Sequence, residues 1–246
     1  MAKVAIPFEK KSIGGTNVFL VANEERSRYI LVDVGLASDH KKVLKFLKDS
    51  GVSYDQIEVI FLTHRHSDHV QGTAKLLAKF EEAGVKPLVI AHSDEVPFIR
   101  DGVLEFPRSL TAITAVQAAM FNALKDTWMG KKMMGIPPIP QIQAWSGDAD
   151  QLRAMGYPVK ILHTPGHTSG GLSLMVEDHV ITGDVSFNLP FAPLKPLFGD
   201  DEAVLRENWV TFAKEGAAIL HPSHGNGICM KKLRAKFPGM AWPEQQ

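Results

Sequence analysis

The chain of 246 residues contains one cysteine, Cys229. A single cysteine excludes an intrachain disulfide and a zinc site built from several thiolates. We expect its side chain to be a buried or half-buried apolar group, because no base stands at a spacing that would make it a nucleophile. The opening MAKVAIPFEKK lacks the apolar run of a signal peptide. No segment approaches the roughly 18 apolar residues of a membrane span, so we expect a cytoplasmic protein with no membrane partner.

An excess of charge of either sign is also absent, since Lys plus Arg and Asp plus Glu both number 27. Such a balance gives no general attraction to nucleic acid, so no nucleic-acid partner is expected. Hydrophobic residues make up 45% and charged residues 22%, as in ordinary globular proteins. The chain has no internal repeat and neither of the glycine-rich patterns, GxGxxG and GxxxxGK[ST], that mark nucleotide-binding folds.

Short β-rich runs alternate with amphipathic helical patterns along most of the chain, which predicts a mixed α/β fold. Strands are expected at 18–22, 29–33, 57–62, 87–91, 159–162, 172–176, 179–182 and 217–220. Helices are expected from Asp39 to about Ser50, at about 70–82 and at about 202–214. Apart from Glu58, the run at 57–62 is apolar, as is typical of a strand covered on both faces.

The segment from about 93 to 156 has a different character and reads as a helical insertion in a single domain spanning 1–246. Ser109 can cap a long helix there, and a loop rich in Met and Pro follows at 133–140. We expect the insertion to pack on the main body, with part of it free to roof a substrate pocket. The apolar positions at helical spacing are Leu110, Ile113, Val116, Met120, Leu124 and Trp128.

Four candidate metal ligands fall within six residues, directly after the strand at 57–62: His64, His66, Asp68 and His69. In an extended segment, residues i and i+2 point the same way, so His64 and His66 can converge on one ion. Asp68 and His69 lie where the chain turns into a helix and can address a neighbouring ion. Imidazole with carboxylate suits zinc, iron, manganese or cobalt, whereas calcium and magnesium prefer oxygen alone.

Three further histidine or aspartate motifs follow in the sequence. His167 lies in the turn TPGHTSGG, Asp184 ends an apolar strand in TGD, and His224 lies in a further expected turn, PSHG. Together with THRHSDH, and in this order and spacing, they resemble the metallo-β-lactamase superfamily. The resemblance covers residues 33–225. It implies a four-layer αββα sandwich, in which two sheets face each other, helices cover the outside and metals sit at one edge.

The resemblance also implies a ligand set for two divalent ions. His64, His66 and His167 would hold the first metal, Asp68, His69 and His224 the second, and Asp184 would bridge them. Zinc is the favoured metal, with iron and manganese as alternatives, and a metal-bridging hydroxide would be the nucleophile. Asp68 would have a catalytic role as well, by orienting the nucleophile or passing on its proton. Asp33 matches a family position that supports a ligand without binding metal.

The substrate is narrowed by departures from particular branches of the family. A bridging carboxylate at Asp184 argues against the β-lactamases, which lack one. The chain after His224 leaves no room for the glutathione-binding domain of glyoxalase II. Phe187 stands where acyl-homoserine lactonases have tyrosine, and the flavodiiron branch would have Glu at the position of His66. The inserted domains of the RNA-processing members are absent, which makes a phosphodiesterase or nuclease a less favoured interpretation.

A metal-dependent hydrolase of a small-molecule ester, thioester or lactone is therefore the favoured function, and an iron-dependent oxidoreductase of the persulfide-dioxygenase type is the alternative. An apolar group near the expected mouth either faces substrate or forms a proline-stiffened loop that packs on the sandwich or on another subunit of a homo-oligomer. It comprises Phe187, Leu189, Phe191, Leu194, Leu197 and Phe198. Among the remaining histidines, we expect His163 and His221 to be hydrogen-bonded at strand ends, and His40 and His179 to be solvated.

Overall fold

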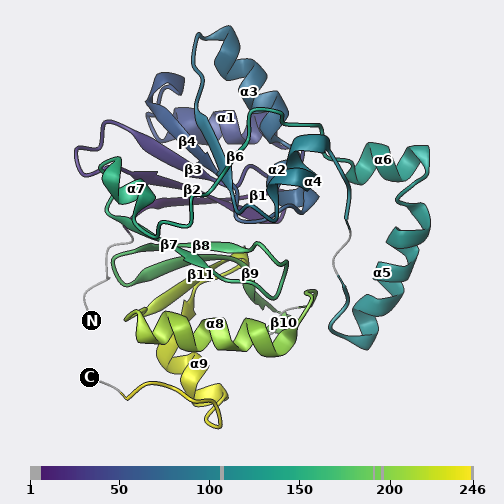
Figure 1. Cartoon of the computed structure of the whole chain (residues 1–246), viewed down its shortest axis with the longest axis vertical. Coiled ribbons are helices and arrows are strands. Elements are labelled where there is room, and N and C mark those ends of the chain that lie inside the picture. Colours follow the sequence, from purple (N-terminus) through teal and green to yellow (C-terminus); the bar gives the residue numbers. More distant parts are fainter. Residues whose placement is uncertain (1–6, 106–107, 191, 195–196, 245–246) are drawn as a thin grey trace.

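The computed structural model describes residues 7–105, 108–190, 192–194 and 197–244. Two sheets pack face to face, with helices on the outer face of each (Figure 1). Helices α1 (His40–Asp49) and α3 (Thr73–Glu82) cover the first sheet, and α8 (Glu202–Lys214) and α9 (Met230–Lys236) cover the second. This arrangement confirms the αββα sandwich expected from the sequence.

The first sheet follows the order β1-β2-β3-β4-β5-β6. Its first three strands pair antiparallel, and the pairs from β3 onward are parallel. The strands are β1 (Glu9–Ile13), β2 (Thr16–Ala22), β3 (Tyr29–Val32), β4 (Ile57–Phe61), β5 (Leu88–Ala91) and β6 (Gln143–Ala144).

Alternation along the first-sheet strands sends neighbouring side chains to two separate cores. In β2, Val18 and Leu20 pack under the outer helices, whereas Phe19 and Val21 face the second sheet. Both sets are buried, so the strand is apolar at every one of these positions. The apolar residues of β4 are buried for the same reason, and its one polar residue, Glu58, is half-buried and accepts a hydrogen bond from the Tyr157 hydroxyl at 2.8 Å.

The second sheet follows the order β12-β11-β9-β8-β7, and β10 pairs with β9. Its core against α8 and α9 includes the fully buried Trp209 and Phe212. The parallel β9–β11 pairing shifts register around Pro222, and it sets His224 beside Phe187. The strands are β7 (Val159–His163), β8 (Leu172–Val176), β9 (His179–Leu189), β10 (Ala192–Pro193), β11 (Ile219–Gly225) and β12 (Ile228–Cys229).

Several elements differ from the sequence expectations. The helix expected at 70–82 is divided into α2 (Ser67–Val70) and α3, because the Gly72 N–H donates to the Gly35 carbonyl at 3.0 Å and not to a carbonyl of the preceding turn. A Cβ at Gly72 would lie 2.8 Å from the Val34 carbonyl oxygen. The PSHG segment is part of β11 rather than a turn, and β9 continues well past Asp184. The remaining elements are a 3-10 turn at Tyr54–Gln56, α4 (Val96–Asp101) and α7 (Gln151–Ala154).

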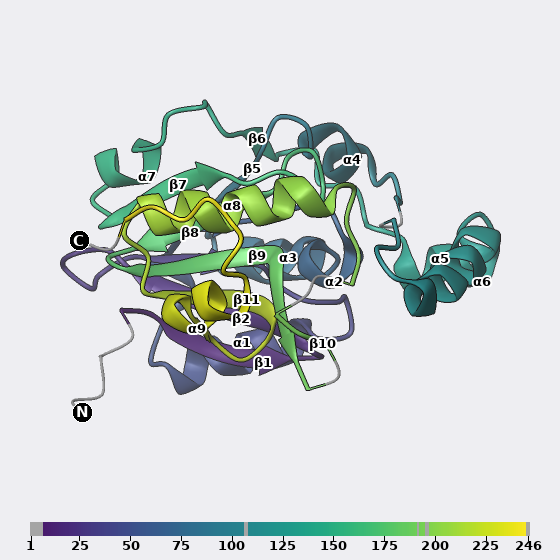
Figure 2. The ribbon, with the colours of Figure 1, turned by 90° about the horizontal axis from the view of Figure 1, so that it is seen from below.

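The long helix expected after Ser109 consists of two helices, α5 (Ala112–Leu124) and α6 (Trp128–Met134). Thr111, not Ser109, caps α5 by accepting a hydrogen bond from the Thr114 N–H, and Thr127 caps α6. Both helices stand away from the sandwich in two perpendicular views (Figures 1 and 2). Val116 and Trp128 are each 74% exposed, so this face of the insertion does not pack on the main body. Elsewhere the insertion does pack as expected, since Ile99, Ile136 and Ile139 are buried in the core of the first sheet.

Two single-residue expectations were also wrong. Cys229 is exposed. His179, expected in a solvated turn, is fully buried at the start of β9. Within the described ranges, no helix is both long and apolar enough to cross a membrane.

Candidate metal centre

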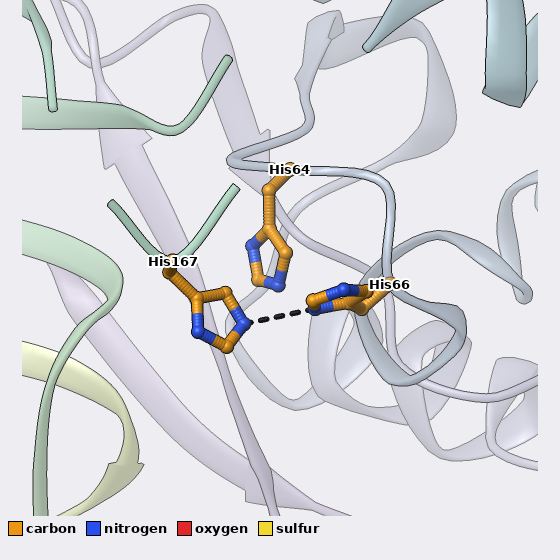
Figure 3. A group of neighbouring side chains, drawn as sticks. All are labelled: His64, His66 and His167. Carbon is orange, nitrogen blue, oxygen red and sulfur yellow. Dashed lines mark hydrogen bonds between the residues drawn. The ribbon is translucent and has the colours of Figure 1, made fainter. Parts of the chain in front are cut away.

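His64, His66 and His167 surround a common point at the edge of the sandwich (Figure 3). His64 and His66 lie in the extended segment after β4, and His66 occupies the N-cap position of α2 with φ −66° and ψ 147°. Their rings are 4.7 Å apart, as the i, i+2 spacing predicted. His167 comes from the loop between β7 and β8, and its Nε2 lies 2.8 Å from His66 Nδ1. All three side chains are buried.

A second group of ligand atoms comes from Asp68, His69 and His224. The first turn of α2 carries Asp68 and His69, and β11 carries His224. His224 Nε2 lies 3.2 Å and His69 Nε2 lies 3.6 Å from Asp68 Oδ2. The turn into α2 therefore brings Asp68 and His69 together with His224 beside the first group, and the centroid of the His69 ring lies 4.0 Å from that of the His64 ring.

Asp184 lies between the two groups. Its Oδ2 is 3.4 Å from His167 Nε2 in the first group and 3.5 Å from His224 Nε2 in the second. Its Oδ1 is 3.5 Å from His69 Nε2. One carboxylate thus reaches both groups, and the structure brings all seven candidate ligands together.

Hydrogen bonds on the outer side of the rings fix the direction of three of the histidines. His69 Nδ1 donates to Asp33 Oδ2 at 2.8 Å. His167 Nδ1 donates to the Phe198 carbonyl at 2.9 Å, and His224 Nδ1 donates to the Gly15 carbonyl at 3.0 Å. In each case Nε2 is left facing the centre, which is the arrangement that metal-binding histidines usually require.

Asp33, expected to support a ligand, is held rigidly behind His69. Its Oδ1 accepts from the Thr63 N–H at 2.9 Å, and its Oδ2 accepts from Thr63 Oγ1 at 2.9 Å. Its backbone has φ of 55°, in the left-handed region. The carboxylate is fully buried and contacts the centre directly through His69. It is also connected to His64, because Thr63 Oγ1 lies 3.0 Å from His64 Nδ1.

Three polar atoms of the centre are buried and have no hydrogen-bond partner: His64 Nε2, His69 Nε2 and Asp184 Oδ1. Unpartnered buried polar atoms destabilise a fold unless something binds them. All three belong to the inward-facing atoms of the two groups. Imidazole nitrogens and carboxylate oxygens are ligands of zinc and related transition metals, so the residues present fit such ions.

The electrostatic environment differs between the two groups. Burial, with the neighbouring His69 and His66, lowers the pKa of His64 well below its ordinary value. Burial, with His167, does the same to the pKa of His66.

In the second group the carboxylates reverse this effect. Burial opposes protonation of His69, but Asp68, Asp184 and Asp33 together raise its pKa well above the ordinary value. Burial is likewise outweighed at His224, where Asp184 and Asp68 raise the pKa to about 10. In the absence of metal, His69 and His224 therefore carry protons at neutral pH, while His64 and His66 do not.

A cavity of about 350 Å³ opens onto the centre. Of the apolar group expected at the mouth, Phe187, Leu189, Leu197 and Phe198 line it. Leu194 packs against the core under α8, and Phe191 lies outside the described residues. Phe187 also stacks on His224, with ring centroids 5.1 Å apart. Most of this group therefore lines the cavity that opens onto the candidate metal centre.

Besides Ser67, four residues of the cavity wall were not predicted from the sequence: Leu104, Glu105, Gln117 and Phe121. They belong to the insertion, of which part was expected to roof a pocket. Gln117 and Phe121 are one helical turn apart on α5, and this i, i+4 spacing was the available signal. Nothing in the sequence distinguished that face from the exposed one, because α5 is rich in apolar residues all round.

The remaining histidines lie outside the two groups. His163 is exposed, and its Nε2 lies 2.9 Å from the Ser169 carbonyl oxygen. His221 is buried, and its Nε2 lies 2.8 Å from His179 Nδ1. Both were expected to be hydrogen-bonded, and both are. His40 is half-buried, with Nδ1 2.9 Å from the Ala37 carbonyl oxygen, so it is less solvated than expected.

Comparisons with known proteins agree with this geometry. A family model described as the metallo-beta-lactamase superfamily matches residues 12–224. A probable metallo-hydrolase of Methanocaldococcus jannaschii is 26% identical over 172 residues, which are 70% of this chain and 68% of that protein. A hydroxyacylglutathione hydrolase of Pelagibacter ubique is 25% identical over 173 residues, which are 70% of this chain and 51% of that enzyme. The chain thus spans about half the length of that relative.

Among solved structures, a protein in a di-iron-bound form superposes with a TM-score of 0.62 at 22% identity. The superposition covers 93% of this chain and 97% of that protein. At this level of identity the likeness concerns the fold.

Proposed function

Because the chain belongs to the metallo-β-lactamase superfamily, we propose that it is a metal-dependent hydrolase of a small-molecule ester, thioester or lactone. One observation supports this most strongly. Five imidazoles and two carboxylates from distant parts of the chain converge at the base of an apolar cavity, and several of their inward-facing atoms have no hydrogen-bond partner.

Two ions would be held by this set, one by His64, His66 and His167 and the other by Asp68, His69 and His224. The Asp184 carboxylate reaches atoms of both groups and would serve both ions. Divalent ions supply a nucleophile at neutral pH by lowering the pKa of bound water, and they polarise the carbonyl under attack. Zinc suits these ligands best, and iron and manganese are alternatives.

Asp68 has a second role in the proposal. Its side chain is 36% exposed and lines the cavity, whereas the side chain of Asp184 is 6% exposed. Burial opposes ionisation of Asp68, but His69 and His224 hold its pKa well below the usual range. The carboxylate is therefore ionised at neutral pH, and it can accept a hydrogen bond from a water in the cavity and orient it.

The cavity wall supports a substrate with an apolar portion beside its carbonyl group. Phe121, Phe187, Leu197 and Phe198 surround the approach to the centre. A thioester is favoured within the ester, thioester and lactone class by the similarity to a hydroxyacylglutathione hydrolase. That enzyme is distant in sequence, so its own substrate is not carried over.

The proposal is tested by measuring bound metal and turnover on the same preparation, with ester, thioester, lactone and phosphodiester probes. We expect hydrolysis of at least one carbonyl probe, abolished by a chelator and restored by zinc. His66→Ala should lose both metal and turnover. His163→Ala is the matched control, since this nearby exposed histidine belongs to neither group.

Oxygen consumption with a persulfide probe, measured on the iron-loaded protein, distinguishes the alternative oxidoreductase. Oxygen uptake without hydrolysis of any carbonyl probe would contradict the proposed function. So would preferential cleavage of the phosphodiester probe.

A further inference from the structure

Arg65 lies between the candidate ligands His64 and His66 in the sequence, and its side chain forms an ion-pair network with Glu95 and Glu105. Its guanidinium Nη1 donates to Glu95 Oε1 at 2.8 Å, and its Nε donates to Glu105 Oε2 at 2.6 Å. The guanidinium carbon lies 4.5 Å from the centroid of the Phe98 ring. The Arg65 side chain is 7% exposed, so this network is a fixed part of the site.

Both carboxylate oxygens of Glu95 accept hydrogen bonds from buried groups of the protein. Its Oε2 accepts from the Arg65 N–H at 2.9 Å, and its Oε1 also accepts from the Gly170 N–H at 2.8 Å. The side chain has no exposed surface. The bond between Glu95 and Arg65 Nη1 therefore balances one carboxylate charge against the guanidinium.

Glu105 is the second carboxylate on the same guanidinium, and it has a different environment. Its side chain is 47% exposed and lines the cavity together with Asp68, whereas Arg65 is not part of the cavity wall. Two carboxylates share one guanidinium, so the network retains one negative charge. Glu105 is the only member of the network that lines the cavity, so this negative charge is exposed to the cavity at the Glu105 carboxylate.

We propose that Glu105 is a specificity-determining residue that disfavours substrates bearing a negative charge and favours neutral or cationic ones. Arg65 acts as the positioning residue that holds the Glu105 carboxylate at the cavity wall. The inference rests on the proposed function for the location of the substrate, and it narrows the substrate class by charge. An anionic group about 6 Å from Glu105 would be disfavoured by roughly tenfold at an effective dielectric constant of about 40, which lies between that of a protein surface and that of bulk water.

The experiment measures binding of thioether analogues, which resemble thioesters but cannot be hydrolysed, to the zinc-loaded protein. Two series are used, with the variable group at the acyl end or at the thiol end. Each series has carboxylate, amide and trimethylammonium members of matched length. Dissociation constants come from calorimetry and from ligand-observed NMR, which detects weak binding.

We expect the carboxylate probe to bind about tenfold more weakly than the amide probe in at least one series. Glu105→Gln, which keeps the size of the side chain, should reduce the ratio of the dissociation constant of the carboxylate probe to that of the amide probe to about one. Glu105→Lys should bring this ratio below one. High salt should reduce the ratio in the wild type but not in Glu105→Gln. Glu215→Gln is the matched control, because Glu215 pairs with Lys160 at 2.8 Å, outside the cavity wall, and its ratio should stay at the wild-type value.

A ratio in Glu105→Gln equal to that of the wild type would overturn the inference, as would a failure of every probe to bind. Hydrolysis of the corresponding neutral thioester is measured in parallel. Hydrolysis with no charge selectivity rejects the role of Glu105 and leaves the proposed function standing. Charge-selective binding without any hydrolysis rejects the proposed function and leaves the role of Glu105 in ligand binding.

Discussion

His69 Nδ1 donates a hydrogen bond to Asp33 Oδ2 at 2.8 Å, and both side chains are fully buried. Because Nδ1 is occupied, Nε2 is the atom that faces the centre, 3.5 Å from Asp184 Oδ1. Asp33, which is not itself a candidate ligand, thus determines which ring nitrogen of His69 faces the candidate metal centre. The orientation of the Asp33 carboxylate is fixed by its left-handed backbone conformation and by the two hydrogen bonds that it accepts from Thr63.

Asp33→Asn should weaken metal binding without unfolding the protein. Asn tolerates the left-handed backbone at this position, but its amide group cannot replace a carboxylate as a strong acceptor for His69 Nδ1. Loss of such a support typically costs about 10–100-fold in metal affinity. Zinc titration against a chromophoric chelator measures the effect.

The matched control is Asp39→Asn, a buried carboxylate that pairs with Lys42 at 2.8 Å and contacts none of the candidate ligands. We expect its zinc affinity to equal that of the wild type. Equal affinities in all three proteins would show that the Asp33–His69 bond has no role in metal binding.

Metal binding should release protons near neutral pH. Burial lowers the pKa values of His224 and His69, but the carboxylates of Asp184 and Asp68 outweigh it, so that the pKa of His224 is raised to about 10 and that of His69 is raised as well. Both rings are therefore protonated in the metal-free protein. Both must lose a proton to bind metal. The apparent affinity should therefore rise with pH up to about 10. Calorimetry in two buffers of different ionisation enthalpy counts the protons, and no buffer dependence at pH 7 would contradict this account.

The part of the ligand cluster at His64, His66, Asp68 and His69 was predictable because its local geometry is set by short-range rules. The other three ligands, His167, Asp184 and His224, were predicted through the resemblance to a known family. The i, i+2 relation of His64 and His66 needs only an extended backbone, and the change of direction at Asp68 needs only a helix start. The apolar runs of β2 and β4 likewise required two covered faces. The extended segment, the helix start and the apolar strands could be predicted because none of them depends on contacts between residues distant in the sequence.

The missed features depend on distant contacts. The pairing of Arg65 with Glu105 joins residues 40 positions apart, and no local pattern encodes it. Strand β1 was missed because its sequence, EKKSI, is polar and its register is set by pairing with β2. His179 was placed in a turn because its partner, His221, comes 42 residues later.

The buried His179–His221 pair should make the protein sensitive to acid independently of metal. Burial, with His179 and Lys10, lowers the pKa of His221 to about 3. The unfolded chain therefore binds a proton at this site below about pH 6.5, whereas the folded protein does not. The stability contributed by neutral His221 is complete above pH 6.5 and is lost as the pH falls towards 3, by up to roughly 1 kcal/mol per pH unit.

Urea unfolding in the presence of a chelator, at several pH values, compares the wild type with His221→Gln. The candidate ligands titrate equally in both proteins, so the difference isolates His221. We expect the difference in the free energy of unfolding to shrink as the pH is lowered from 6.5. A difference that is constant with pH would refute the assignment.

Phe121→Ala should reduce selectivity for apolar acyl groups while leaving the metal content unchanged. Phe121 lies on the cavity face of α5, so its removal opens the apolar wall. We expect kcat/KM for a long-chain thioester to fall by about tenfold relative to an acetyl thioester. Val116→Ala, on the same helix but 74% exposed, should leave the ratio unchanged. Equal ratios in both variants would show that α5 takes no part in substrate binding.

Anomalous X-ray scattering at the zinc edge, from crystals of the zinc-loaded protein, tests the central claim most directly. The account predicts two peaks, one among His64, His66 and His167 and the other among Asp68, His69 and His224, with Asp184 beside both. The second peak should weaken in crystals of Asp33→Asn. No peak at either position, or zinc bound only elsewhere on the protein, would contradict the account.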